Sequence, residues 1–412
     1  MTAAIIITFC ALLLIAYLFD LTSARTKIPS VILLLALGWL VKQTTVFLGI
    51  TVPNLDEVLP VFATLGLILI VLEGSLELEL NKSKIGLITK SLLGALLSML
   101  ALAFALAYLL NYIGGYSFTQ SLINVIPLCV ISSAIAIPSV RNLSSKNREF
   151  VIYESSLSDI IGVIFFNFMV FNEVYNAKSF GHFGLELLLI LFISAIATIG
   201  LAILLNRIDH HIKFVPIILL LIVVYEVLKI YHLPSLIFIL IFGLFLGNLD
   251  EISHLKLVKK LKPQSLTAEV DRFKDVIIEG AFLIRALFFL LFGYQIEMAD
   301  LLNTDSIALA FAVVIGIYVI RLLQLVLSRL PLFPLIFVAP RGLITILLFI
   351  SIVPEDAIPI VNNSLVLKVI ILTALVMMFG MLTNTQKKDK LTVEPVNVDA
   401  DSLEDADSKE ID

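Results

Sequence analysis

Apolar runs of about eighteen residues or more recur along nearly the whole of this 412-residue chain. A run of that length lets a helix cross the hydrocarbon core of a bilayer, where each segment has to satisfy its own backbone polar groups. The chain is 60% hydrophobic and 15% charged, with a mean hydropathy of +1.07, whereas soluble domains are about 25% charged. The sequence therefore predicts an all-α polytopic membrane protein.

Hydropathy predicts thirteen transmembrane helices. Their expected ranges are 3–20, 29–49, 57–79, 85–113, 118–142, 149–174, 184–206, 213–230, 234–249, 275–296, 306–328, 332–352 and 364–384. Basic residues gather in every second connection, beginning with Arg25 and Lys27. The positive-inside rule then puts the N-terminus outside and the C-terminus in the cytoplasm. We expect a multi-pass protein of the cell membrane, plasma or inner, that contacts lipid and binds no nucleic acid.

Thirteen helices divide into two units of six with one helix between them. The first repeat covers about residues 1–174, the linker helix about 184–206 and the second repeat about 213–384, so that residues 1–384 form one transmembrane domain. Two such units have opposite orientations, which is the inverted-repeat plan of many secondary transporters. Residues 385–412 are acidic and lack aromatic residues, and we expect them to form a disordered cytoplasmic tail.

The sixth predicted helix carries two carboxylates deep within its apolar length. Residues 149–174, EFVIYESSLSDIIGVIFFNFMVFNEV, contain Glu154 and Asp159. A charge at membrane depth costs about 2.5–3.5 kcal/mol on insertion scales, which makes each carboxylate a functional candidate. Their spacing puts them roughly 140° apart on a helix, so Glu154 shares a face with Ser158, and Asp159 shares one with Ser155. The alternative is that packed polar neighbours satisfy both carboxylates and neither has a further role.

The fifth and twelfth predicted helices are interrupted at corresponding positions of the two repeats. The fifth, SLINVIPLCVISSAIAIPSVRNL, has Ser132 and Ser133 followed by Pro138. The twelfth, PLIFVAPRGLITILLFI, is broken by Ala339–Gly342. The pattern predicts that helices 5 and 12 are discontinuous, with freed carbonyls and half-helix ends that can coordinate a cation. The alternative is that each proline only kinks a packed helix.

The stretch SSAIAIPSVRNLSSKNREFVIYESSLSDIIGVIFF resembles the monovalent cation:proton antiporter superfamily, and supporting matches cover most of residues 1–384. The supporting segments are KIPSVILLLALGWL, LILIVLEGSLEL, FLIRALFFLLFGYQIEM and APRGLITILLF. The resemblance is strongest to the sodium/proton antiporters of the NhaP and NHE type. It implies the antiporter fold of the NhaA and NapA kind, and a homodimer.

The resemblance also implies roles for single residues. Asp159 is expected to carry the ion, and Glu154 is expected to form a structural ion pair with Arg341. Three further charged residues are supporting candidates, namely Glu73, Arg285 and Arg321. Two departures leave the ion open between sodium and potassium: Ser158 replaces the Asn or Asp of the sodium/proton branch, and SSAIAIP replaces its Thr-Asp-Pro.

A carboxylate that alternates between a proton and a dehydrated monovalent cation couples two opposite flows, which is antiport. Hydroxyls would complete an oxygen shell around such a hard cation, and the candidates are Ser132, Ser133, Ser155 and Ser158. With Arg341 neutralised by Glu154, Asp159 is the single exchangeable charge, so the expected cycle exchanges one Na⁺ or Li⁺ for one H⁺ without net charge movement. We expect no enzymatic activity and no cofactor. The alternatives are a potassium/proton antiporter, in which K⁺ is carried, and a non-transporting sensor or channel on the same fold.

Overall fold

The computed structural model describes residues 2–26, 28–50, 55, 58–172, 177–208, 210, 212–231, 233–252 and 263–383. These residues form helices joined by turns and short irregular segments, with no strand among them. Ten of the described helical segments are long and apolar enough to cross a membrane. The chain is therefore a multi-pass, all-α membrane protein, as the sequence predicts. The predicted tail at 385–412 lies outside the described residues.

In chain order the elements are α1 (Thr2–Thr26), α2 (Ser30–Phe47), α3 (Val58–Glu77), η1 (Lys82–Lys84), α4 (Ile85–Gly114), α5 (Phe118–Cys129), α6 (Ser133–Ser139), α7 (Ser145–Phe171), α8 (Ala177–Arg207), α9 (Phe214–Ile230), α10 (Leu236–Gly247), α11 (Leu249–Ile252), α13 (Pro263–Gln295), α14 (Met298–Leu302), α15 (Ile307–Leu327), η2 (Leu335–Phe337), α16 (Leu343–Ile350) and α17 (Asn363–Thr383). Each of the thirteen predicted ranges contains helix. Because α9, α10 and α16 are shorter than a full span, the count of thirteen spans stays a prediction.

α13 begins at Pro263, twelve residues before its predicted start at 275. Its first part is amphipathic rather than uniformly apolar, so hydropathy alone misses it. Leu266, Val270, Phe273 and Ile277 are all buried, and their spacing puts them on one helix face. The apolar face packs inward and charged residues lie on the other side. α13 therefore begins before the uniformly apolar range 275–296 that hydropathy detects.

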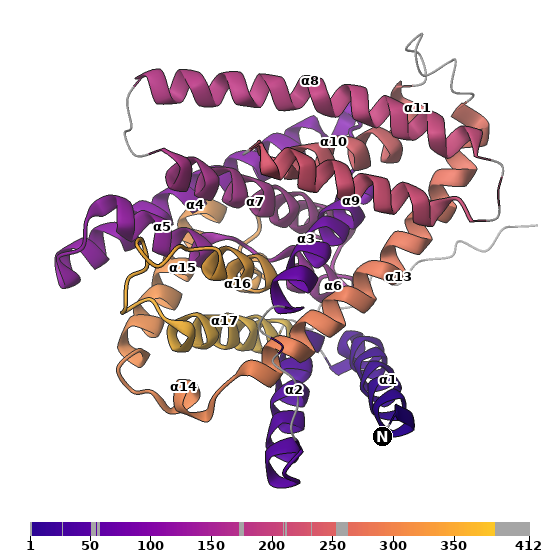
Figure 1. Ribbon diagram of the computed structural model, residues 1–412. Coiled ribbons are helices and arrows are strands. Elements are labelled where there is room, and N and C mark those ends of the chain that lie inside the picture. The colour runs from indigo at the N-terminus through magenta and orange to yellow at the C-terminus, as the bar shows by residue number, and fades with distance from the viewer. Residues whose placement is uncertain are drawn as a thin grey trace, which may run out of the picture.

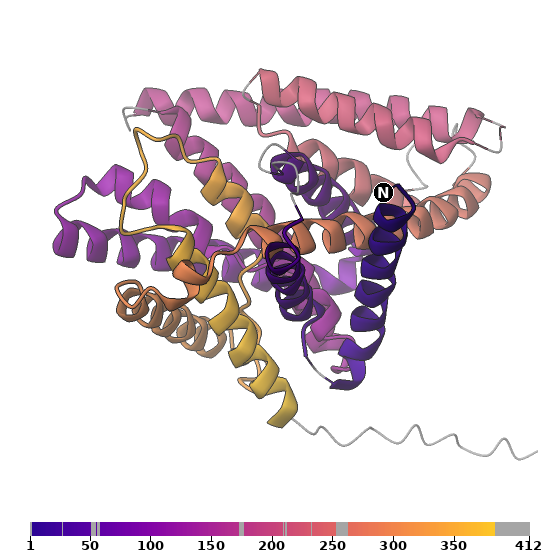
Figure 2. The ribbon, with the colours of Figure 1, turned by 60° about the horizontal axis from the view of Figure 1, so that its bottom comes forward.

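The helices gather into two bundles (Figure 1). In the first bundle α3 packs against α10 and α13, while α2 packs on α13 and α8 on α10. The second bundle holds α4, α5, α6, α7, α15, α16 and α17, and Figure 2 shows α15 alongside α17 within it. α3 lies at the boundary, where it contacts α6, α7 and α16. The second bundle contains both interrupted helices, so it holds the candidate site.

Both predicted interruptions are present. The fifth predicted helix divides into α5 and α6, with Val130 and Ser132 in extended conformation between them. The twelfth divides into η2 and α16, and residues 338–342 between them are not helical. The two unwound segments touch, since the Ser132 backbone N–H donates a 2.9 Å hydrogen bond to the carbonyl of Pro340. Each unwound segment thus provides a hydrogen-bond partner for a backbone group that has no helical partner in the other segment.

The crossing depends on a glycine. A Cβ added at Gly342 would lie 2.6 Å from the Oγ atom of Ser132, closer than side chains can pack. Glycine therefore permits the close approach of the two unwound segments. The matched breaks are a packed feature of the fold, beyond what a simple proline kink would produce.

Candidate functional site

Asp159 lies beside the crossing, on α7, and is only 1% exposed. Its Oδ2 atom accepts a hydrogen bond from the Ser133 hydroxyl at the start of α6. Its Oδ1 atom has no hydrogen-bond partner among the described residues. One carboxylate oxygen is therefore anchored to the broken helix, and the other has no hydrogen-bond donor among the described residues.

The other predicted serines form no hydrogen bond with this carboxylate among the described residues. The Ser158 hydroxyl accepts a 3.0 Å hydrogen bond from the backbone N–H of Ile131, so it supports the first unwound segment. The Ser155 hydroxyl donates to the carbonyl of Val151 at 2.7 Å, which leaves its lone pairs available. The Ser132 hydroxyl is buried, without a partner among the described residues, and faces Gly342. The structure joins Ser133 directly to Asp159 and assigns Ser158 to the backbone.

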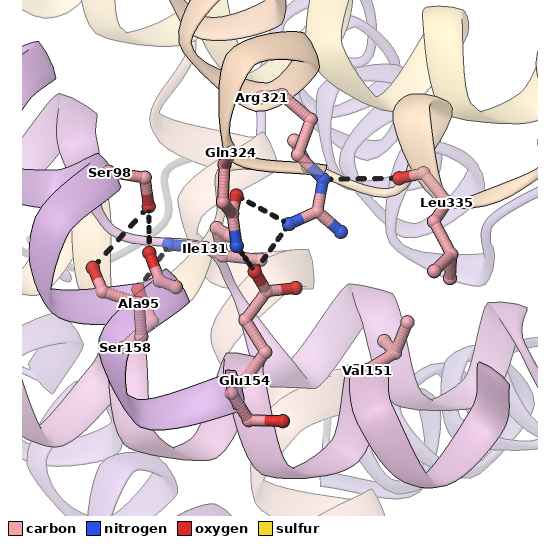
Figure 3. A network of polar contacts seen from close by, with 12 residues as sticks. Ala95, Ser98, Ile131, Val151, Glu154, Ser158, Arg321, Gln324 and Leu335 are labelled. Carbon is pink, nitrogen blue, oxygen red and sulfur yellow. Dashed lines mark hydrogen bonds and ion pairs between the residues drawn. The ribbon is translucent and has the colours of Figure 1, made fainter. Parts of the chain in front are cut away.

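Glu154 takes part in a separate buried network, drawn in Figure 3. Its Oε1 atom accepts a 2.5 Å hydrogen bond from Nη1 of Arg321 on α15 and a second one from Nε2 of Gln324. Arg321 Nη1 also donates to Gln324 Oε1 at 3.0 Å, and its Nε donates to the carbonyl of Leu335 at 3.1 Å. Glu154 and Arg321 are 1% and 2% exposed in their side chains. This network ties α7, α15 and η2 together.

The predicted pair of Glu154 with Arg341 is therefore wrong. Arg341 lies within the second break, where its Nε donates to the carbonyl of Leu128 at 2.7 Å and its Nη1 to that of Ala339 at 3.2 Å. Unwound backbone frees carbonyls that need donors, and this guanidinium satisfies one from each interrupted helix. Among the described residues Glu154 has Arg321 as its salt-bridge partner instead.

Sequence reasoning kept Arg321 as a supporting residue only and missed Gln324. Their spacing of three on α15 places both side chains on one helix face. An arginine and a glutamine on one face of an otherwise apolar helix are a signal that could have identified the partner of Glu154.

A polar cavity of about 330 Å³ leads to the site. Its lining runs from the exposed Glu79 and Arg148 to the buried Ser133, the residue that contacts Asp159. Glu73 and Arg285 both line the cavity and face each other at 3.8 Å. Two of the three supporting candidates, Glu73 and Arg285, are thus brought together in the cavity lining.

Lys84 anchors the mouth of the cavity. Its Nζ atom lies 2.6 Å from Glu79 Oε2 and 3.4 Å from Glu149 Oε1. The hydrogen bond with Glu79 raises the pKa of Lys84, so its ammonium stays charged at neutral pH. These contacts link the connection after α3 to α7 at the cavity rim.

A multi-pass protein in which two broken helices cross beside a buried carboxylate has the arrangement of a secondary ion transporter. The family model for the transmembrane sodium/hydrogen exchangers matches residues 10–385, and the chain belongs to that family. Members exchange a cation for a proton, so this protein is a cation/proton antiporter and not an enzyme.

Two solved structures have the same fold. The sodium proton antiporter MjNhaP1 from Methanocaldococcus jannaschii at pH 8 shares 16% identity at a TM-score of 0.64, over 92% of this chain and all of that one. An electron-microscopy structure of MjNhaP1 gives a TM-score of 0.65 at 16% identity, over 92% of this chain and 95% of that one. No curated protein sequence matches this chain.

Proposed function

We propose that this protein exchanges Na⁺ or Li⁺ for H⁺ in a one-for-one, electroneutral cycle, with Asp159 alternately protonated and cation-bound. The observation that carries the proposal is the free Oδ1 atom of Asp159, buried beside the crossing of two broken helices. The Ser133 hydroxyl holds the other oxygen and lies at the inner end of the cavity. Proton and cation compete for one carboxylate, so each can bind only after the other has left.

The charge count of the site supports an electroneutral cycle. Arg321 is neutralised by Glu154, while Arg341 is held by backbone carbonyls. Arginine does not release its proton in proteins, so neither guanidinium takes part in the exchange. Asp159 carries the same formal charge with H⁺ as with Na⁺ bound, and the two loaded states therefore carry equal charge across the membrane.

The cavity lining supports an orientation. Its mouth includes Lys84, Arg141 and Arg148, which belong to the basic connections that the positive-inside rule assigns to the cytoplasm. The state described here is then inward-facing, with the cation path open toward the cytoplasm. The same proposal includes the cell membrane as location, two inverted repeats within residues 1–384, and a homodimer.

Potassium/proton exchange is the second candidate. It is favoured by the serines of the first break, because the residue of that break that contacts Asp159 is Ser133, a neutral hydroxyl and not an acid. With a neutral hydroxyl instead of a second carboxylate, the site attracts a cation less strongly. It therefore offsets the dehydration cost of a small ion such as Na⁺ less fully than that of K⁺. Ion competition decides between the two.

The test uses purified protein in proteoliposomes with an imposed pH gradient, whose dissipation is followed after addition of Na⁺, Li⁺ or K⁺. We expect Na⁺ and Li⁺ to dissipate the gradient and Asp159→Asn to abolish that response while the protein stays folded. Asp305→Asn, which changes an exposed acid, is the control and should exchange normally. Cation-dependent proton flux through Asp159→Asn would refute the role of Asp159, and a response to K⁺ alone would favour the second candidate.

A further inference from the structure

Ser156 is a buried polar residue without a role in the function proposed above. It lies on α7 and is 4% exposed. Its hydroxyl has no hydrogen-bond partner among the described residues. Serines in membrane helices usually donate to a carbonyl one turn back, as Ser155 does to Val151. Ser156 therefore holds a polar oxygen whose hydrogen-bonding capacity the fold leaves open.

The surroundings of this hydroxyl connect it to the ion path. A Cβ added at Gly74 on α3 would lie 2.8 Å from Ser156 Oγ, so the hydroxyl rests against the bare backbone of that glycine. Gly74 lines the polar cavity together with Ser133. The Ser156 hydroxyl thus lies against a residue of the cavity lining.

Asp159 contacts another residue of the cavity lining, Ser133. Asp159 follows Ser156 by three residues, and this spacing separates two side chains by about 60° around a helix. Asp159 contacts Ser133 of α6, whereas Ser156 contacts Gly74 of α3. Ser156 and Asp159 thus each contact a residue that lines the cavity, Gly74 on α3 and Ser133 on α6.

We propose that the Ser156 hydroxyl is a further ligand of the cation that binds Asp159. This inference rests on the proposed antiport. A hydroxyl oxygen suits a hard monovalent cation, and a dehydrated ion needs several such oxygens. A proton on the carboxyl group needs none of them. Ser156 accordingly favours the cation-bound state over the protonated one, and it sets cation affinity without changing the chemistry of proton binding.

The experiment measures cation-dependent exchange in proteoliposomes over a range of Na⁺ concentrations at fixed pH. For Ser156→Ala we expect the half-saturating Na⁺ concentration to rise by about 3- to 10-fold, the effect of losing one polar contact, with a maximal rate close to that of the parent. Ser156→Thr keeps the hydroxyl and should retain most of the affinity. Ser194→Ala removes an equally buried, unpartnered hydroxyl on α8 and should leave the half-saturating concentration unchanged.

A second variant tests the geometry without removing the hydroxyl. Gly74→Ala would push against Ser156 Oγ, and we expect it to raise the half-saturating Na⁺ concentration in the parent. In the Ser156→Ala background the same change should have a smaller effect, because the displaced oxygen is already gone. Additive effects of the two substitutions would overturn the proposed contact.

The outcomes separate this inference from the function on which it rests. If the parent shows no cation-dependent exchange, antiport itself fails and Ser156 loses its role with it. If the parent exchanges Na⁺ and Ser156→Ala has the parent's half-saturating concentration, only the ligand role is overturned. A Ser156→Ala protein with a lower melting temperature and a lower maximal rate, but unchanged Na⁺ dependence, would show a packing role and would likewise overturn it.

Discussion

The buried pair of Glu154 and Arg321 predicts how charge loss within the second bundle affects stability. Arg321→Met would remove the guanidinium and leave Glu154 Oε1 with Gln324 as its remaining side-chain donor. Both charged side chains are almost completely buried, so water cannot replace the lost partner. Removing one member of such a pair costs about 3–5 kcal/mol, because the other charge stays buried and uncompensated.

The double variant should recover part of that cost. Glu154→Gln combined with Arg321→Met removes both charges, and contacting residues of this kind typically show a coupling energy of about 0.5–3 kcal/mol. Glu154→Gln combined with Arg341→Met should instead be nearly additive, since Arg341 donates to the carbonyls of Leu128 and Ala339. Arg341→Met alone should still destabilise the protein, because those carbonyls lose their donor.

The assay is thermal unfolding of the purified single and double variants in one detergent, analysed as two double-mutant cycles. Coupling in the Glu154 and Arg321 cycle, with additivity in the Glu154 and Arg341 cycle, is the expected result. The reverse pattern would refute the assignment of Arg321 as the partner of Glu154 and restore the pairing expected from the sequence.

Three more predictions follow from other parts of the molecule. Exchange rates and equilibrium ion ratios in vesicles should be the same with the membrane potential clamped to zero or to either sign. A potential acts on each net charge moved with about 2.3 kcal/mol per 100 mV, so a systematic voltage dependence would reject the one-for-one cycle. Lys368→Met should lower the melting temperature without changing Na⁺ affinity. Lys368 Nζ on α17 donates to two backbone carbonyls and two hydroxyls, and it thereby holds the turn that precedes α15 against α17. An unchanged melting temperature would contradict this anchoring role. Gly162→Ala should impair exchange and cost about 1–3 kcal/mol of stability through overpacking, because its Cβ would lie 2.4 Å from a methyl group of Val130. Val130→Ala in the same chain should restore part of that stability, measured as the melting temperature.

The general architecture could be predicted because the bilayer imposes simple rules on sequence. Long apolar runs predicted the helices, and the Ser132–Ser133 pair and the Ala339–Gly342 stretch identified both breaks, which the structure contains. Pro138, the other signal in the fifth predicted helix, lies within α6. Asp159 stood out because a carboxylate at membrane depth is costly. Each of these signals is local to one segment of the chain.

What could not be predicted depends on how separate helices are rotated against one another. Both Arg321 and Arg341 are intramembrane arginines, and the sequence does not say which of them faces Glu154. Backbone carbonyls are invisible to sequence patterns as partners, so Leu128 and Ala339 could not be recognised as acceptors for Arg341. The contact of Ser156 with Gly74 likewise exists only once α3 and α7 are packed.

The partner of Glu154 has a consequence for how the protein is made. Arg321 follows Glu154 by 167 residues, and ribosomes extend a chain at about 5–20 residues per second. For roughly ten to thirty seconds of synthesis at that rate, α7 exists without the arginine that neutralises its glutamate. Until then the Glu154 side chain has to be protonated, kept hydrated near the insertion machinery or bound by a chaperone. Assembly of the Glu154 network is then a late event, completed only when α15 arrives beside α7.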